Sequence, residues 1–453
     1  MKALRHDNTR MTEGPIGREI ISFTVPLFIG NLFQQLYNTA DALIVGNFVG
    51  NDALAAVTAT GSLVFMLISF FGGLSAGAGV AISRYYGARD AERLGKAVHT
   101  NISIGFIATA VLTLLGAFLT PTLLRWMDTP ADIFDMAAEY VFIYFLGSIG
   151  MVFYNTFRGM MQAVGDSRNP LIYLIISSLT NVVLDLVFVI CFHMGVAGAA
   201  IATVISQLLS AVLCLIRLMR TDEDYRVSFR ALCLDRIMLR QIIEYGLPSG
   251  LQNSVIAIAN VVVQANINAF GTMAVAGCGA YTKIEGFAFL PINSFVIALT
   301  TFVGQNLGAG EHERARKGAR FGLFWGIVSA ETIGFLVYIL APYLIGAFTS
   351  EPEALYYGIL KSRACAPFFF LLAASHCTAS ILRGAGKAVV PMAVMLSFWC
   401  VVRVSILSIF VPLYHNIAIV NWVYPITWFL STVVLGIYYL KADWIHAFDE
   451  MKA

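Results

Sequence analysis

Charged residues are scarce in this chain. Asp, Glu, Lys and Arg make up 12% of the 453 residues, while 58% are hydrophobic and the mean hydropathy is +0.76. Soluble globular domains carry about 25% charged residues, so this composition excludes an ordinary soluble domain. The formal net charge of +2 lacks the basic excess that attracts nucleic acid, and no such partner is expected.

Sequence motifs typical of disulfide-bonded, metal-binding and catalytic proteins are also missing. The seven cysteines are scattered without a CxxC pair, so neither a disulfide framework nor a zinc site is indicated. No HExxH motif and no aspartate pair beside a nucleophile occurs, so we expect no enzyme and no cofactor. No cleavage site follows the charged N-terminus, which indicates that the first apolar run is a retained membrane span.

Long apolar runs fill most of the sequence. Each is long enough to cross a bilayer, which needs roughly 20 residues, and there are about twelve. The runs lie near residues 17–46, 53–82, 97–119, 137–163, 170–192, 196–218, 242–270, 273–303, 318–348, 355–382, 390–413 and 417–440. The sequence therefore predicts an all-α polytopic membrane protein with about twelve transmembrane helices.

Lys and Arg are distributed asymmetrically between the predicted loops. Clusters follow the even-numbered spans, at residues 84–96, 158–168, 217–240, 314–320 and 383–387. The loops after odd-numbered spans are assigned only Arg125, Lys361 and Arg363. Because Lys and Arg concentrate in cytoplasmic loops, both termini are predicted to be cytoplasmic and the protein to lie in the cytoplasmic membrane.

The two halves of the sequence repeat one another. REIISFTVP ending at Pro26 matches RQIIEYGLP ending at Pro248, and RYYGARDAERLGK matches QNLGAGEHERARK at nearly the same offset. Both halves begin on the same side of the membrane, so the repeat is parallel. We expect an N-terminal six-helix bundle over residues 1–220, a polar cytoplasmic linker over 221–240, and a C-terminal six-helix bundle over 241–453.

Two aspartates interrupt the apolar runs of the first half. Asn181 and Asp185 are four residues apart and share one helix face, and Asp41 lies in the first span. Carboxylates inside a membrane are costly and mark ion or substrate pathways. A polar stripe at Gln34 and Asn38 precedes Asp41 on the same helix face, although such amides can also join helices by hydrogen bonds.

The motifs YYGARDAERLGK, GQNLGAGEHERARK and FRGMMQAVGDSRNP resemble those of the multidrug and toxic compound extrusion (MATE) family. The similarity covers about residues 15–440, and Asp41 with Asn181 and Asp185 resembles the archaeal and DinF-like branches. This resemblance implies a V-shaped pair of six-helix bundles. It also implies antiport that couples H⁺ or Na⁺ entry to export of amphipathic, often cationic compounds.

The resemblance adds residues to the candidate site. Asn155 and Thr203 stand where those branches use an Asn and a Thr. The coupling ion is then H⁺ shared by these groups, or Na⁺ held by the oxygens of Asp41, Asn181, Asp185 and Thr203. Pro26 would bend the first span, because proline removes a backbone hydrogen bond. The protein is expected to act as a monomer in contact with membrane lipid.

The second half does not duplicate the acidic site. Asn260 and Gln264 form a polar face on the seventh span and, with Glu285, are candidates to line the substrate cavity. Lys283, Glu285, Glu331 and Arg403 either form ion pairs that join helices or, at Glu285, supply a second cation or drug site.

Two other membrane functions compete with antiport. A lipid-linked sugar or lipid flippase of the same superfamily would place several basic residues in its cavity. The sequence assigns only Lys283 and Arg403 to the membrane, against three or four acids. A channel would need a ring of charges, which two aspartates in one half do not make.

Overall fold

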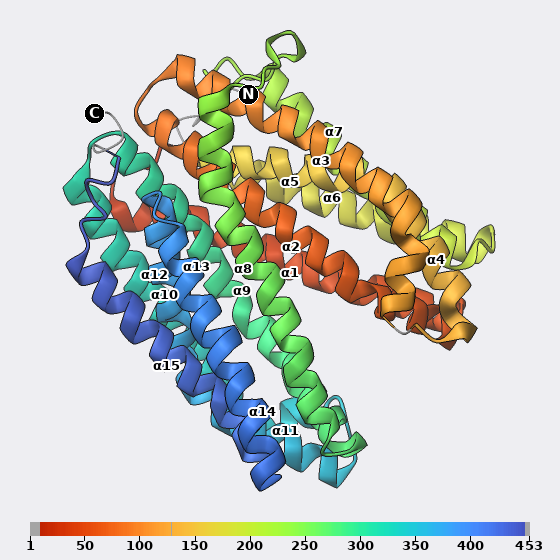
Figure 1. Cartoon of the computed structure of the whole chain (residues 1–453). Coiled ribbons are helices and arrows are strands. Elements are labelled where there is room, and N and C mark those ends of the chain that lie inside the picture. Colours follow the sequence, from red (N-terminus) through yellow and green to blue (C-terminus); the bar gives the residue numbers. More distant parts are fainter. Residues whose placement is uncertain (1–9, 128, 449–453) are drawn as a thin grey trace. The chain divides into compact units, whose positions relative to one another are not determined.

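The computed structural model describes residues 10–127 and 129–448 (Figure 1). Within these ranges the regular elements are all helices. The structure does not describe some side chains of the first two helices, namely those at positions 42, 43, 47, 51, 54, 58, 59 and 62–68.

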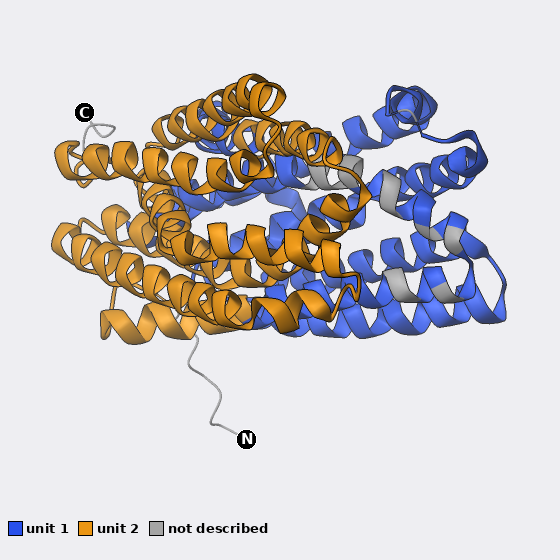
Figure 2. Ribbon diagram, turned by 90° about the horizontal axis from the view of Figure 1, so that it is seen from below, with its two compact units in different colours: residues 1–9, 29–250 blue, residues 10–28, 251–453 orange. Residues whose placement is uncertain are grey.

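The chain contacts group into two units. Unit 1 contains Ile29–Gly250, and unit 2 contains Arg10–Phe28 with Leu251–Ala453 (Figure 2). Two long helices, α1 (Ile16–Phe48) and α8 (Arg236–Asn268), therefore each contribute to both units. The expected division at residues 220 and 240 stays a prediction.

The remaining helices follow in sequence order. Unit 1 contains α2 (Asn51–Gly87), α3 (Ala91–Trp126), α4 (Ala131–Leu146), α5 (Ser148–Ala163), α6 (Arg168–Asp185), the π-helical turn η1 (Leu186–Cys191), α7 (Gly195–Arg220) and the short η2 (Phe229–Ala231). Unit 2 contains α9 (Thr272–Gly308), α10 (His312–Gly346), α11 (Pro352–Cys365), η3 (Ala366–Phe368), α12 (Phe369–Gly384), α13 (Val389–Met395), the π-helical turn η4 (Leu396–Val402), α14 (Arg403–Tyr414) and α15 (Ile417–Lys441).

The helices confirm a repeat of element order. Helices α1 and α8 both have 33 residues, and α2 and α9 both have 37. The fourth span of each half is broken, between α4 and α5 and again at η3. The fifth span of each half contains a π-helical turn, η1 in one half and η4 in the other. The two halves therefore share one architecture.

Helix length and composition confirm a multi-pass membrane protein. Among the described residues, ten helices are long and apolar enough to span a membrane, and the α4–α5 pair, bent by 50°, would be an eleventh. The remaining expected span, near residues 53–82, lies in α2. Large apolar side chains on the outer faces stay exposed, including Leu440 at 81% and Trp126 at 80%, as lipid contact requires.

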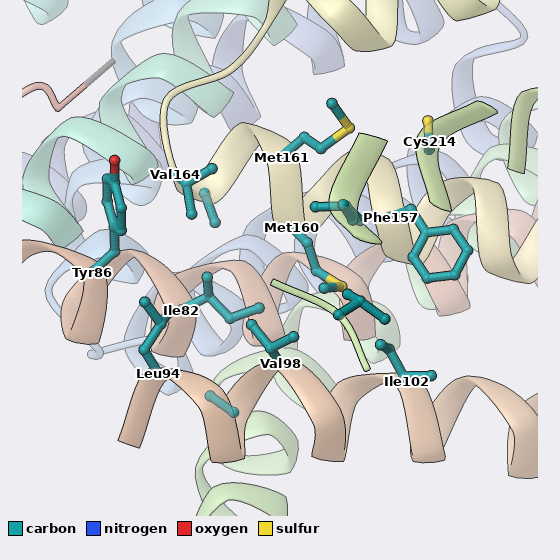
Figure 3. Close-up of a cluster of buried hydrophobic side chains, with 14 of the residues drawn as sticks. Ile82, Tyr86, Leu94, Val98, Ile102, Phe157, Met160, Met161, Val164 and Cys214 are labelled. Atoms are coloured by element: carbon teal, nitrogen blue, oxygen red, sulfur yellow. The ribbon is translucent and has the colours of Figure 1, made fainter. Parts of the chain in front are cut away.

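An apolar core fixes the helices of unit 1. Figure 3 shows side chains from α2, α3, α5 and α7 meeting in one cluster, among them Ile82, Val98, Phe157, Met160 and Cys214. Ile82, Val98 and Cys214 are fully buried. Because α5 and α7 also carry Asn155 and Thr203, this packing positions two of the candidate site residues.

Glycines allow the first half of α8 to pack closely on α2 within unit 1. A Cβ atom added to Gly73 would lie 2.5 Å from the Cα of Gly250, and one added to Gly77 would lie 2.2 Å from the Cα of Gly246. Distances this short leave no room for a side chain at either crossing point.

Candidate functional site

Polar side chains of α1, α6 and α7 form a candidate ion site in unit 1. Asn181 and Asp185 are fully buried at the C-terminal end of α6, and Thr203 of α7 is 5% exposed. Asp185 directly precedes the π-helical turn η1. Such turns occur frequently at functional sites because they interrupt the regular helical hydrogen bonds.

Hydrogen bonds join three of these residues. With its amide oriented so that both polar atoms have partners, Asn181 donates from Nδ2 to Oδ2 of Asp185 at 2.8 Å. Its Oδ1 then accepts from the backbone N–H of Thr203 at 3.2 Å. The hydroxyl of Thr203 donates to the carbonyl of Ala199 at 3.0 Å. Asn181 therefore links α6 to α7 and orients the Asp185 carboxylate.

The two aspartates interact with each other and keep unused acceptors. Asp41 of α1 is half-buried and lies close enough to Asp185 for electrostatic coupling. Oδ1 of Asp41 and Oδ1 of Asp185 are buried and accept no hydrogen bond from the described residues. A buried carboxylate oxygen without a donor is unfavourable, so each fits a proton or a hard cation such as Na⁺.

Tyrosines surround the aspartates. Tyr37 lies one turn before Asp41 on α1, beside Thr203, and interacts electrostatically with both aspartates, as does Tyr140 of α4. The Tyr140 ring stacks on Tyr144 at 6.3 Å. The sequence analysis missed these residues. The spacing of four residues between Tyr37 and Asp41 was the signal available to find one of them.

Asn155 lies elsewhere in unit 1. Its Nδ2 donates to the carbonyl of Met151 at 2.8 Å, one turn earlier on α5. The side chain lines a small cavity of about 20 Å³ together with Ser75, Asn101 and Thr156. Most of the cavity lining is apolar, and its volume is about that needed to hold one water molecule. The structure therefore brings together four of the five predicted coupling residues, and places Asn155 beside a separate small cavity.

The predicted cavity residues differ in exposure. Gln34 is half-buried and Asn38 is exposed on α1. On α8, Asn260 and Gln264 are exposed, and Gln264 donates to Asn268 at 2.9 Å. Exposed amides are costly against lipid, so these faces suit a water-filled space.

Unit 2 contains a second buried polar cluster. Glu285 of α9 is half-buried and interacts electrostatically with Lys361 of α11 and Arg403 of α14. The assignment of Lys361 to a loop is wrong, because it is 2% exposed inside a helix of the membrane-spanning segment Pro352–Gly384. Lys283 is exposed, and Glu331 accepts the backbone N–H of Phe370 at 2.9 Å.

Pro26 and Pro248 lie where α1 and α8 change unit. Unit 2 ends in α1 at Phe28, and unit 1 ends in α8 at Gly250. Both prolines lie inside their helices, where each removes one backbone hydrogen bond.

Comparisons with known proteins agree with this architecture. The MatE family model matches residues 26–187 and 248–409. The probable multidrug resistance proteins YoeA and YpnP of Bacillus subtilis (strain 168) are similar to the chain. YoeA is 27% identical over 434 residues, covering 94% of this chain and 93% of the relative. YpnP is 29% identical over 396 residues, covering 86% and 87%.

Solved structures show the same fold. An outward-facing multidrug resistance MATE family transporter of the MOP superfamily superposes with a TM-score of 0.89 at 24% identity, covering 99% of both chains. Since the family model matches both halves of the sequence, the chain is a member of the MATE family of membrane transporters.

Proposed function

We propose that this transporter is a cation-coupled antiporter that exports amphipathic, often cationic compounds across the cytoplasmic membrane. The observation that carries the proposal is the buried pair of Asp41 and Asp185, each with Oδ1 lacking a hydrogen-bond donor among the described residues. The names of the multidrug resistance relatives support export of toxic compounds.

Antiport requires that ion and cargo compete. When Asp41 and Asp185 are ionised, their charge attracts a cationic compound from the cytoplasm. When H⁺ or Na⁺ from outside neutralises the pair, the cargo loses this attraction and leaves. The effect is reciprocal: bound ion lowers the affinity for the cargo, and bound cargo lowers the affinity for the ion by the same factor.

Other residues have supporting roles in this proposal. Gln34, Asn38, Asn260 and Gln264 contribute polar contacts to the substrate cavity, and Pro26 is the hinge of α1. Asn181 holds the Asp185 carboxylate, and the backbone of Thr203 holds Asn181. Asn155, beside its own small cavity, contributes to ion coupling. The protein acts as a monomer, with both termini in the cytoplasm.

Reconstitution in liposomes tests the coupling. A pH gradient and a Na⁺ gradient are imposed separately, and efflux of a fluorescent cationic dye is followed. Asp41→Asn and Asp185→Asn keep the size of the side chain but remove its charge. We expect each to lower gradient-driven efflux by about 100-fold, as loss of an essential charged group does.

Asp52→Asn is the matched control, because Asp52 is an exposed carboxylate in the first turn of α2. It should transport at the wild-type rate. Glu285→Gln should reduce efflux less than either aspartate variant does. If both aspartate variants export normally and Glu285→Gln does not, the coupling site lies in unit 2 and the proposal is wrong.

A further inference from the structure

Within the described part of unit 2, two buried cations interact with one acid, Glu285. Lys361 and Arg403 are each 2% exposed. Glu285 is the carboxylate that interacts with both, and it forms no ion pair within 4 Å with either among the described residues. With all three groups ionised, one positive charge is in excess. A buried charge without a partner is unfavourable, so this cluster is electrostatically suited to an additional anion.

Aromatic rings hold the two cations in place. Nζ of Lys361 lies 5.5 Å from the ring centre of Tyr281 and 5.1 Å from that of Tyr424. The Arg403 guanidinium lies 4.4 Å from the same Tyr424 ring and 5.3 Å from that of Trp399. Both cations therefore lie against Tyr424, and cation–π contact offsets part of the cost of their burial.

Several hydrogen-bonding groups at this cluster are unused. Arg403 donates from one terminal nitrogen to Thr427 at 2.9 Å, while its Nε has no hydrogen-bond partner in the described part of the chain. Within the same residues, both amide atoms of Asn421 lack partners, although the side chain is buried. The planar fork of arginine matches the oxygens of a carboxylate or a phosphate.

Asn421 lies close to the cations along the helices. Its backbone carbonyl accepts from the Cys365 thiol at 3.5 Å, and Cys365 is one turn after Lys361 on α11. Tyr424 is one turn after Asn421 on α15. Glu285 and Tyr424 are half-exposed, whereas both cations are buried, so these two side chains form the accessible edge of the cluster.

We propose that Lys361, Arg403 and Asn421 bind the anionic group, a carboxylate or a phosphate, of an aromatic amphipathic solute. The half-exposed ring of Tyr424 packs against its apolar part. This inference rests on the proposed transport function and extends its cargo to zwitterionic and anionic compounds. It also reverses the role suggested for Glu285, which opposes the bound anion instead of attracting a cation.

Calorimetric titration of the purified protein in nanodiscs tests the site. Three probes share a naphthalene ring: 1-naphthoate, 1-naphthyl phosphate and the neutral 1-naphthalenemethanol. We expect at least one anion to bind about tenfold more tightly than the alcohol, since a charge-assisted hydrogen bond is about twice as strong as a neutral one. The two anionic probes distinguish a carboxylate site from a phosphate site.

Variants change this preference in opposite directions. Lys361→Met and Arg403→Gln should abolish the preference for the anion, while Glu285→Gln should strengthen anion binding several-fold because it removes the opposing charge. Asp52→Asn, which changes a distant exposed carboxylate, should leave the preference unchanged. If the Met and Gln variants at the cations fail to fold, Glu285→Gln still decides the question, because it preserves the shape of the side chain.

Equal affinity of the wild-type protein for all three probes would overturn the anion site, as would a Glu285→Gln variant that binds anions no more tightly. Dye efflux from proteoliposomes separates this result from the proposed function. If gradient-driven efflux is normal but the protein shows no preference for the anions, only the anion-site proposal is wrong. If the protein prefers the anions but shows no gradient-driven efflux, the antiport proposal is wrong and the anion site is supported.

Discussion

Polar side chains inside the membrane segments differ in whether their hydrogen-bonding capacity is used. Glu331 of α10 is an example of a used group, because its Oε2 accepts the N–H of Phe370 at 2.9 Å. Phe370 lies in the first turn of α12, where N–H groups have no partner within the helix. The carboxylate therefore caps α12 and has a structural role. Asp41 and Asp185, by contrast, each keep one buried oxygen that finds no donor among the described residues.

Substitution of Glu331 tests this structural role. Glu331→Gln keeps an oxygen that can accept the Phe370 N–H, so stability and transport should remain close to those of the wild type. Glu331→Leu removes the acceptor and should destabilise the protein by about 1 kcal/mol, the typical value of a helix cap. Thermal unfolding in detergent measures the difference. A Gln variant with impaired ion-driven efflux and normal stability would instead place Glu331 in the transport mechanism.

Residue spacing predicted part of the candidate ion site. Asn181 and Asp185 share a helix face, as their spacing of four residues requires, and the buried environment follows from the apolar run around them. Lys361 could not be placed this way. Its closeness to Arg363 in the sequence is typical of a charged loop. Its burial depends on contacts with Tyr281 and Tyr424, which belong to helices distant in the sequence. Such tertiary contacts leave no local pattern.

Helix boundaries show how far periodicity and composition can define the elements. The apolar runs located the spans, and the matched motifs predicted the repeat that appears in the equal lengths of α1 and α8. The π-helical turns η1 and η4 were not predicted, because the segments Leu186–Cys191 and Leu396–Val402 are as apolar as regular helix. The exchange of α1 and α8 between the units depends on packing, which the repeat alone does not specify.

Pro26 provides a prediction about helix α1. It lies two residues before the point where the helix changes from unit 2 to unit 1. Pro26→Ala restores a backbone N–H donor and should stiffen α1. We expect efflux from proteoliposomes to slow several-fold, with normal insertion and folded yield. Pro342→Ala is the matched control, because Pro342 lies inside α10, which belongs entirely to unit 2.

The outcomes for these two proline variants separate a hinge from a general effect of helix composition. A slower Pro26→Ala variant beside a normal Pro342→Ala variant supports the hinge. Unchanged efflux kinetics of Pro26→Ala would remove this proline from the mechanism.

For the molecule as a whole, the orientation in the membrane decides the direction in which the proposed antiport would move its cargo. Clusters of Lys and Arg follow the even-numbered spans, and the burial of Lys361 inside unit 2 removes one of the few exceptions to this pattern. Exposed carboxylates mark both predicted sides. Asp52 and Asp132 begin α2 and α4 on the predicted outer side, while Glu92 and Glu313 begin α3 and α10 on the cytoplasmic side.

Cysteine labelling of intact cells tests this orientation. Each of the four carboxylates is replaced by cysteine in a background without native cysteines, because Cys191 is itself exposed. A membrane-impermeant maleimide should label Asp52→Cys and Asp132→Cys in intact cells, and Glu92→Cys and Glu313→Cys only after permeabilisation. The two positions on each side control for one another. Labelling of both predicted cytoplasmic positions in intact cells would show that the protein has the opposite orientation in the membrane. The proposed antiport would then carry compounds into the cell.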